Sequence, residues 1–389
     1  MAYQLNLFNF DREYKKISKP IRLIELFAGI GSQHKALSAL GVPFESWKIC
    51  EWAVPSIKAY NSIHIKDFTD YSVSKSKEEM IQRIQGVSLN YNEPISNLEK
   101  KPIEWIKDVY NNVIATKNLV NIMDVKGSDL EIVDTDKYEY IMTYSFPCQD
   151  LSLAGLRKGM SVSQSEGGTR SGLLWEVERI LDECENKPQI LLMENVPEVV
   201  GAGNLEDFTR WENKLVSLGY TNFWQILNAK NYGIPQNRRR CFMVSILGNY
   251  SYDFPVRLKL KYKLKDLLDS DVDKKYYLTD ESIERISNWK AQQKPLENIE
   301  SNLSISPTLT ARGAGEEHSG MVLIDAELVR GGLKIKNATK KGYIEAEVGD
   351  GIDISSRMES HRGTVQKGSC QTITCQGGES VGVVVNDKK

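Results

Sequence analysis

Short apolar runs alternate with amphipathic segments along roughly the first 250 residues of the chain. Runs rich in Ile, Leu, Val and aromatic side chains, bounded by polar or turn-forming residues, predict buried strands. Five such runs occur, at residues 22–27 (RLIELF), 46–50 (SWKIC), 138–146 (YEYIMTYSF), 189–196 (QILLMENV) and 239–247 (RRCFMVSIL).

Helical patterns fill two of the intervals between these strands. Residues 32–41 (SQHKALSALG) show a helical pattern that Gly41 can end. A second helix is indicated by one apolar stripe, made of Leu173, Leu174, Val177, Ile180, Leu181 and Cys184. This alternation predicts an α/β fold, a mostly parallel sheet with helices on both faces, in which ligands bind beyond the carboxyl ends of the strands.

Composition and charge argue against a membrane protein and leave nucleic-acid binding open. The chain has 389 residues, a formal net charge of −2, no apolar run long enough for a membrane span and no signal segment. We therefore expect a soluble, cytoplasmic protein without membrane contact. The balanced charge neither supports nor excludes nucleic acid. Six scattered cysteines without metal-binding spacing predict reduced thiols and no metal.

The loops after the first two strands predict a nucleoside site. Gly29 and Gly31 follow the first strand, but His34 interrupts the G-x-G-x-x-G spacing, which disfavours a pyrophosphate. Glu51, twenty residues beyond Gly31, could accept hydrogen bonds from ribose hydroxyls or be an exposed loop residue. Trp52 could stack on adenine or fill the core. Asp124 could bind an adenine amino group or be solvated; together these features favour S-adenosylmethionine.

Reactive side chains follow the later strands. Cys148 comes directly after Pro147 at the end of an apolar run, although a lone cysteine is more often simply buried. Glu194 ends a strand of Leu and Met and is a candidate proton donor, or else a structural carboxylate paired with an Arg. Arg238 and Arg240 share one face of the last strand, where they could bind a substrate carbonyl or only phosphates.

Six segments occur in a fixed order over residues 21–246: ELFAGIG, CEW, SFPCQDLSLAG, TRSGLLWEVERIL, MENVPEVV and YGIPQNRRR. In this order they resemble the DNA cytosine-5 methyltransferase family. The resemblance implies a Rossmann-like S-adenosylmethionine-dependent methyltransferase domain, a smaller, mainly β target-recognition lobe, and duplex DNA as partner.

The resemblance also implies a role for each matching residue. Cys148 is the expected nucleophile that adds to carbon 6 of a cytosine flipped out of the duplex. Glu194 is expected to support protonation at ring nitrogen 3, while Arg240 holds the carbonyl oxygen and Arg238 matches the first Arg of Q-x-R-x-R. Gln149 and Ser152 are expected to contact the opened DNA. The expected cofactor contacts are Phe27, Gly29, Gly31, Glu51, Trp52, Asp124, Pro147 and Leu174.

The domain organisation follows from these segments. We expect a catalytic domain over residues 20–249, with a helical insertion at 71–121, and a recognition lobe over 250–389. Within that lobe, residues 306–325 and 370–387 share a T-[LI]-T core, a Gly-rich turn and a closing apolar strand. The R-x-L-T-P-x-E and G-N-S-V segments of relatives are not visible, which predicts a lobe incomplete at its C-terminus or a second chain that supplies them.

Two alternative functions stay open at this level. A branch of the family methylates tRNA, but its cysteine is followed by different residues from the Gln149 and Asp150 of this chain, which favours DNA. The second alternative is a non-catalytic DNA-binding remnant. A bacterial or phage gene fits the family.

Overall fold

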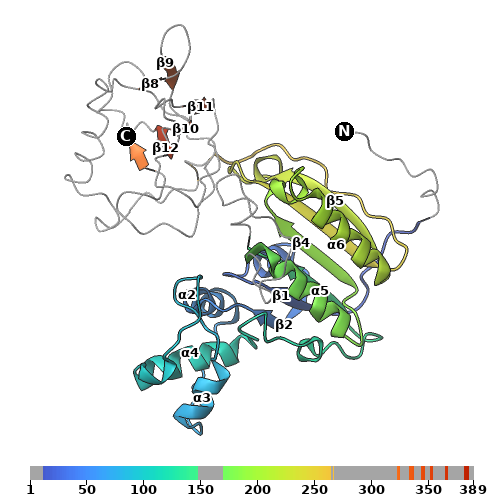
Figure 1. The fold of residues 1–389 in the computed structure, drawn as a ribbon. Coiled ribbons are helices and arrows are strands. Elements are labelled where there is room, and N and C mark those ends of the chain that lie inside the picture. The colour runs from blue at the N-terminus through green and yellow to red at the C-terminus, as the bar shows by residue number, and fades with distance from the viewer. Residues whose placement is uncertain are drawn as a thin grey trace. The chain divides into compact units, whose positions relative to one another are not determined.

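A computed structural model describes residues 12–147, 170–263 and 266, and the backbone of six short strands between residues 322 and 384 (Figure 1). The chain divides into two compact units. The first consists of Met1–Ile226 and Cys241–Phe254, and the second of Leu227–Arg240 and Pro255–Lys389.

A six-stranded sheet with the order β2-β1-β3-β4-β6-β5 organises the first unit. Its strands are β1 (Ile21–Leu26), β2 (Phe44–Cys50), β3 (Glu139–Tyr144), β4 (Ile190–Asn195), β5 (Tyr220–Asn228) and β6 (Arg239–Leu247). The first four pair in parallel, and β6 runs antiparallel to β4. The predicted α/β fold with a mostly parallel sheet is confirmed.

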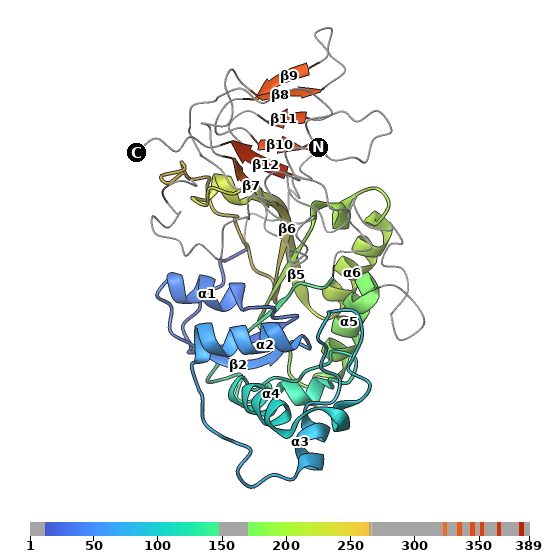
Figure 2. The ribbon, with the colours of Figure 1, turned by 90° about the vertical axis from the view of Figure 1, so that its left-hand side faces the viewer.

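Helices cover both faces of this sheet, as predicted (Figure 2). Because side chains alternate along a strand, Ile24 and Leu26 pack toward α5 (Leu174–Glu183) and α6 (Leu205–Ser217). Leu23 points to the other face, where it packs near Leu37 of α1 (Ser32–Ala39). The predicted apolar stripe of the second helix is buried in full.

A small helical layer follows β2. It consists of α2 (Val54–Tyr60), the π-helical turn η1 (Asn61–Ile65), α3 (Lys77–Arg83) and α4 (Ile103–Ala115). The three α-helices share a core of their own. Ser76 and Glu79 form a capping box that starts α3. Single turns complete the unit: η2 (Leu98–Lys100), η3 (Gly127–Leu130), η5 (Arg170–Leu173) and η6 (Pro197–Val200). The turn η7 (Ala229–Asn231) belongs to the second unit.

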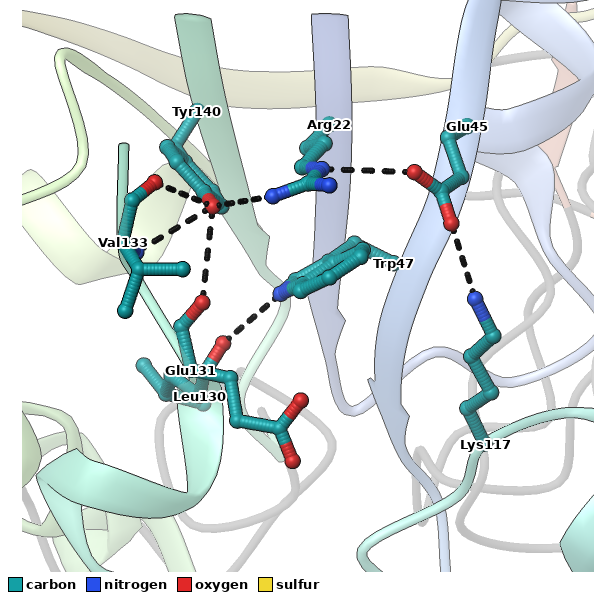
Figure 3. Close-up of polar contacts among 8 residues, drawn as sticks. All are labelled: Arg22, Glu45, Trp47, Lys117, Leu130, Glu131, Val133 and Tyr140. Carbon is teal, nitrogen blue, oxygen red and sulfur yellow. Dashed lines mark hydrogen bonds and ion pairs between the residues drawn. The ribbon is translucent and has the colours of Figure 1, made fainter. Parts of the chain in front are cut away.

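Arg22 contacts residues of the neighbouring strands β2 and β3 on the amino-terminal side of the sheet (Figure 3). The Arg22 guanidinium lies 3.6 Å from the Trp47 ring centroid and donates to the Tyr140 hydroxyl at 2.8 Å and to Glu45 at 3.3 Å. Trp47 Nε1 in turn donates to the Leu130 carbonyl at 2.9 Å. These contacts hold the segment before β3 against the sheet, near the amino-terminal ends of the strands.

The second unit contains strands alone among its described elements beyond residue 320. They are β7 (Val322–Ile324), β8 (Leu333–Lys336), β9 (Tyr343–Ala346), β10 (Gly351–Asp353), β11 (Thr364–Gln366) and β12 (Val381–Val384). Four form a sheet with the order β11-β10-β12-β7, and β8 pairs with β9. The predicted mainly β lobe is confirmed for these residues. The closing strands of the two similar segments, β7 and β12, pair in parallel.

In the described part of the chain, no helix combines the length and the apolar character needed to cross a bilayer.

Candidate functional site

The carboxyl ends of four parallel strands meet at one edge of the sheet. In the strand register Leu26 lies beside both Cys50 and Tyr144, and Tyr144 lies beside Met193. Neighbouring strands are about 4.8 Å apart. The turns that follow β1, β2, β3 and β4 are therefore neighbours, as the sequence predicted for a ligand site.

The turn after β1 has an unusual backbone. Phe27, Gly29 and Gly31 have φ angles of 58°, 56° and 82°, and the left-handed region is costly for a residue as large as Phe27. A Cβ on Gly29 would meet nothing within 4 Å, so its outer side is open to a ligand. A Cβ on Gly31 would lie 2.5 Å from His64 Nε2. Internal packing thus requires glycine at position 31, and its cofactor contact stays a prediction.

Glu51 is fixed at the end of β2 by backbone amides. One carboxylate oxygen accepts from the Gly29 N–H at 2.8 Å, and the other accepts from the Ala53 N–H at 2.7 Å. Asn118 holds the main chain of Glu51 from both sides, at 3.0 and 2.9 Å. Burial raises the pKa of Glu51, and the bonds from backbone N–H groups oppose that shift. A carboxylate has about four acceptor positions, so this one retains capacity for ribose hydroxyls.

Asp124 lies in the segment that runs beside the end of β2. That segment begins at a parallel bridge between Ile49 and Asn118, and the Cys50 thiol donates to the Val120 carbonyl at 3.4 Å. Burial raises the pKa of Cys50, and the charges of Glu51 and Asp124 raise it further. Asp124 is exposed, and its carboxylate accepts from Asn121 Nδ2 at 2.7 Å.

The remaining predicted cofactor residues differ in exposure. Phe27 is half-buried against the core between the sheet and α5, and Trp52 is half-buried against the core of the helical layer. Pro147 is half-buried after β3. Leu174 is 0% exposed within the core, so a ligand could meet only its main chain. The contacts of these four residues with the cofactor stay predictions.

Asn195 connects the turns after β3 and β4, and the sequence analysis missed it. Its Nδ2 donates to the Phe146 carbonyl at 3.0 Å, and its Oδ1 accepts from the Val196 N–H at 2.8 Å. The signal in the sequence is an asparagine beside Glu194 at a strand end. Cys148, Gln149 and Ser152 follow Phe146 and Pro147 but lie outside the described residues.

Glu194 lies on β4 and Arg240 on β6, while Arg238 directly precedes β6. Glu194 is half-buried near the end of β4, opposite Phe242 in the register. At the start of β6, Arg239 is exposed while Arg238 and Arg240 are half-buried, in line with the predicted alternation. Arg238 and Arg240 belong to the second unit. The catalytic roles of these residues stay predictions.

The three cysteines of the described segments are poorly suited to act as nucleophiles. Cys50, Cys184 and Cys241 are all buried. Burial raises the pKa of Cys184 to about 11 and that of Cys241 to about 12, and the pKa of Cys50 also lies well above its usual value. A thiol with such a pKa is protonated at neutral pH and is a poor nucleophile.

Glu25, the penultimate residue of β1, supports the turn that follows this strand. It is 1% exposed; one carboxylate oxygen accepts from the His34 N–H at 3.2 Å and the other from the Tyr60 hydroxyl. Gly31 gives α1 no side-chain cap, so Glu25 fulfils that role from the neighbouring strand. Burial raises the pKa of Glu25 to about 7, against the effect of both hydrogen bonds.

We expect Glu25→Gln to change the dependence of stability on pH between about 4.5 and 7. In this window the folded chain holds the proton of Glu25 and the unfolded chain does not, so the contribution of Glu25 to the free energy of unfolding falls as pH rises and levels off above 7. His34, whose pKa burial lowers to about 4, contributes a slope of the opposite sign, which the substitution leaves in place. The shift corresponds to roughly 3 kcal/mol. Urea unfolding at pH 5 and pH 8 measures the difference. The surface variant Glu104→Gln should keep the wild-type slope; the same slope in Glu25→Gln would contradict the prediction.

A family model described as C-5 cytosine-specific DNA methylase matches residues 96–367. This chain belongs to that family. Orphan methyltransferase M.SssI from Spiroplasma monobiae is 39% identical over 269 residues, which cover 66% of this chain and 67% of the relative. Type II methyltransferase M2.ScrFI from Lactococcus lactis subsp. cremoris is 36% identical over 269 residues, covering 68% and 71%. The S. pombe Dnmt2 methyltransferase structure is 16% identical, with a TM-score of 0.44 and coverage of 73% and 68%.

As a C-5 cytosine-specific DNA methylase, the protein is a methyltransferase that uses S-adenosylmethionine and acts on duplex DNA. The residues at the carboxyl edge fit this cofactor. An open Gly29, a fixed carboxylate at Glu51 and an exposed carboxylate at Asp124 suit a nucleoside, which offers hydroxyl and amino donors and has no pyrophosphate. The family and the cofactor predicted from the sequence are thus confirmed.

Proposed function

We propose that this protein methylates carbon 5 of a cytosine that is flipped out of duplex DNA, through a covalent bond between the base and Cys148. One observation carries the proposal. The carboxyl edge of the sheet brings together the fixed Glu51 carboxylate after β2, Pro147 after β3, directly before Cys148, and the end of β4, where Glu194 lies, in a chain of the cytosine methylase family.

The chemistry assigns a task to each side chain. Carbon 5 of cytosine is a weak nucleophile, and addition of the Cys148 thiolate to carbon 6 changes this by pushing an electron pair toward carbon 5. Glu194 donates a proton to ring nitrogen 3, and Arg240 holds the carbonyl oxygen next to Arg238. When bound, S-adenosylmethionine supplies the methyl group. Loss of the carbon 5 proton to a base and release of the thiolate then restore the ring.

Two further observations support this assignment of the nucleophile. The cysteines of the described segments are buried with raised pKa values, which leaves them poorly suited to attack. Asn195 holds the Phe146 carbonyl two residues before Cys148, so the approach to that position is tied to the strand of Glu194. Flipping the base costs a few kcal/mol, and we assign Gln149 and Ser152 to contacts that stabilise the opened duplex.

The distribution of tasks along the chain is part of the proposal. We assign catalysis and cofactor binding to residues 20–249, with 71–121 as an insertion, and target recognition to residues 250–389. A second chain that completes the recognition lobe stays a prediction.

Methyl transfer from labelled S-adenosylmethionine tests the proposed reaction. Purified protein is incubated with duplex DNA and, separately, with tRNA, and bisulfite sequencing locates the modified bases. We expect label in DNA at carbon 5 of cytosine. Label in tRNA alone would favour the tRNA alternative, and DNA binding without transfer would favour a non-catalytic role.

Glu51→Ala should weaken the binding of S-adenosylmethionine by about ten- to a hundredfold, because charge-assisted hydrogen bonds to the ribose are lost. Isothermal titration calorimetry measures this change. Glu45 is half-exposed near the start of β2, the strand that Glu51 follows. Glu45→Gln should bind S-adenosylmethionine as the wild type does. Unchanged affinity in Glu51→Ala would overturn the ribose assignment.

A further inference from the structure

The loop that carries Asp124 is held by a single arginine of α5. Arg179 Nη2 donates to the Val125 carbonyl at 2.8 Å and to the Ile122 carbonyl at 3.3 Å. These two carbonyls lie on either side of Asp124 in the chain. One guanidinium nitrogen therefore bridges the backbone around the residue proposed to recognise adenine.

The rest of the guanidinium is fixed by two carboxylates of the same helix. Nε donates to Glu176 at 2.9 Å, and Nη1 donates to Glu183 at 2.8 Å. The Glu176 side chain is only 6% exposed and the Arg179 side chain 34% exposed, so the ion pair is shielded from solvent on its Glu176 side. A planar group bound along two edges has little freedom to rotate, and it presents Nη2 to the loop in one orientation.

The far end of the loop is bound to the same helix. The Gly127 N–H donates to the other oxygen of Glu183 at 2.9 Å, and this bond lowers the pKa of Glu183 together with Arg179. A Cβ on Gly127 would lie 2.5 Å from the Cys184 backbone nitrogen, so the two backbones are in close contact. Arg179 and Glu183 thus act as one clamp on residues 122–127.

We propose that Arg179 is a positioning residue that sets the specificity of the cofactor site for adenine. It contacts no ligand itself, and it keeps the loop in the conformation that presents the Asp124 carboxylate to the 6-amino group. The inference rests on the proposed role of Asp124. A carboxylate accepts a hydrogen bond from an amino group and repels a carbonyl oxygen, so the clamp should favour adenosyl over inosyl ligands.

The test compares the dissociation constants of S-adenosylhomocysteine and S-inosylhomocysteine by calorimetry. We expect the wild type to prefer the adenosyl compound by about ten- to a hundredfold. Arg179→Met should bring this ratio close to one, mainly by weakening the adenosyl compound. Arg179→Lys should retain only part of the preference, because its ammonium keeps the positive charge but lacks the planar fork that reaches both carbonyls. A purely structural role would weaken both ligands equally and leave the ratio unchanged.

Matched variants separate the possible outcomes. Lys214 on α6 forms ion pairs with Asp182 and Glu178 of α5, the helix of Arg179, at 2.7 and 3.8 Å. Lys214→Met removes these ion pairs and should keep the wild-type ratio. Asp124→Ala should lose the preference; if it does not, the proposed role of Asp124 is wrong. Loss of preference in Asp124→Ala with full preference in both Arg179 variants would overturn the inference about Arg179. Urea midpoints verify that each variant is folded. If Arg179→Met does not fold, the ratio of the two dissociation constants is taken from Arg179→Lys instead.

Discussion

Cys148→Ser is expected to lower the rate of methyl transfer by more than about a thousandfold while DNA binding persists. An ordinary thiol has a pKa near 8.5 and is a few per cent ionised at neutral pH, whereas a serine hydroxyl is almost wholly protonated and much less nucleophilic. Loss of a covalent nucleophile commonly removes most of the catalytic effect. Single-turnover transfer from labelled S-adenosylmethionine measures the rate, and a gel-shift assay measures DNA binding.

A covalent trap makes the assignment of Cys148 stricter. In DNA synthesised with 5-fluorocytosine, the wild type should form an adduct that survives denaturation, since fluorine cannot leave as a cation. Cys148→Ser should form none. Cys184→Ala is the matched control, because Cys184 is a buried thiol with a raised pKa, and it should form the adduct as the wild type does. An adduct with Cys148→Ser would show that another group attacks the base.

Glu194→Gln is expected to lower the single-turnover rate by about a hundred- to ten-thousandfold, the usual contribution of a positioned proton donor. Glutamine has a similar shape but cannot give a proton to ring nitrogen 3. Calorimetry should show unchanged affinity for S-adenosylmethionine, because the proposed cofactor contacts come from other parts of the chain.

Glu198→Gln is the control for that substitution, since Glu198 lies four residues later in η6, beyond the strand. It should keep the wild-type rate. A wild-type rate in Glu194→Gln would exclude Glu194 as the donor, and a loss of cofactor affinity would place it instead at the cofactor site.

The sequence by itself determined five of the sheet strands, two of the helices and the family of this protein, but it did not indicate β5. Residues 239–247 were predicted as a strand and form β6, and the stripe from Leu173 to Cys184 is buried along α5. Such features are visible in the chain because the periodicity of a strand or helix is a local property. The order of the six motifs is likewise a property of the linear chain, which is why the cytosine methylase family could be inferred before any fold was known.

Only the tertiary structure decided how distant residues support the site. It showed that β6 runs against β4, that His64 packing requires glycine at position 31, and that Leu174 is enclosed by the core. It also joined Arg179 to the Ile122 and Val125 carbonyls, more than fifty residues earlier in the chain. No local pattern encodes these contacts, because each depends on strand direction and helix packing that bring together residues far apart in sequence.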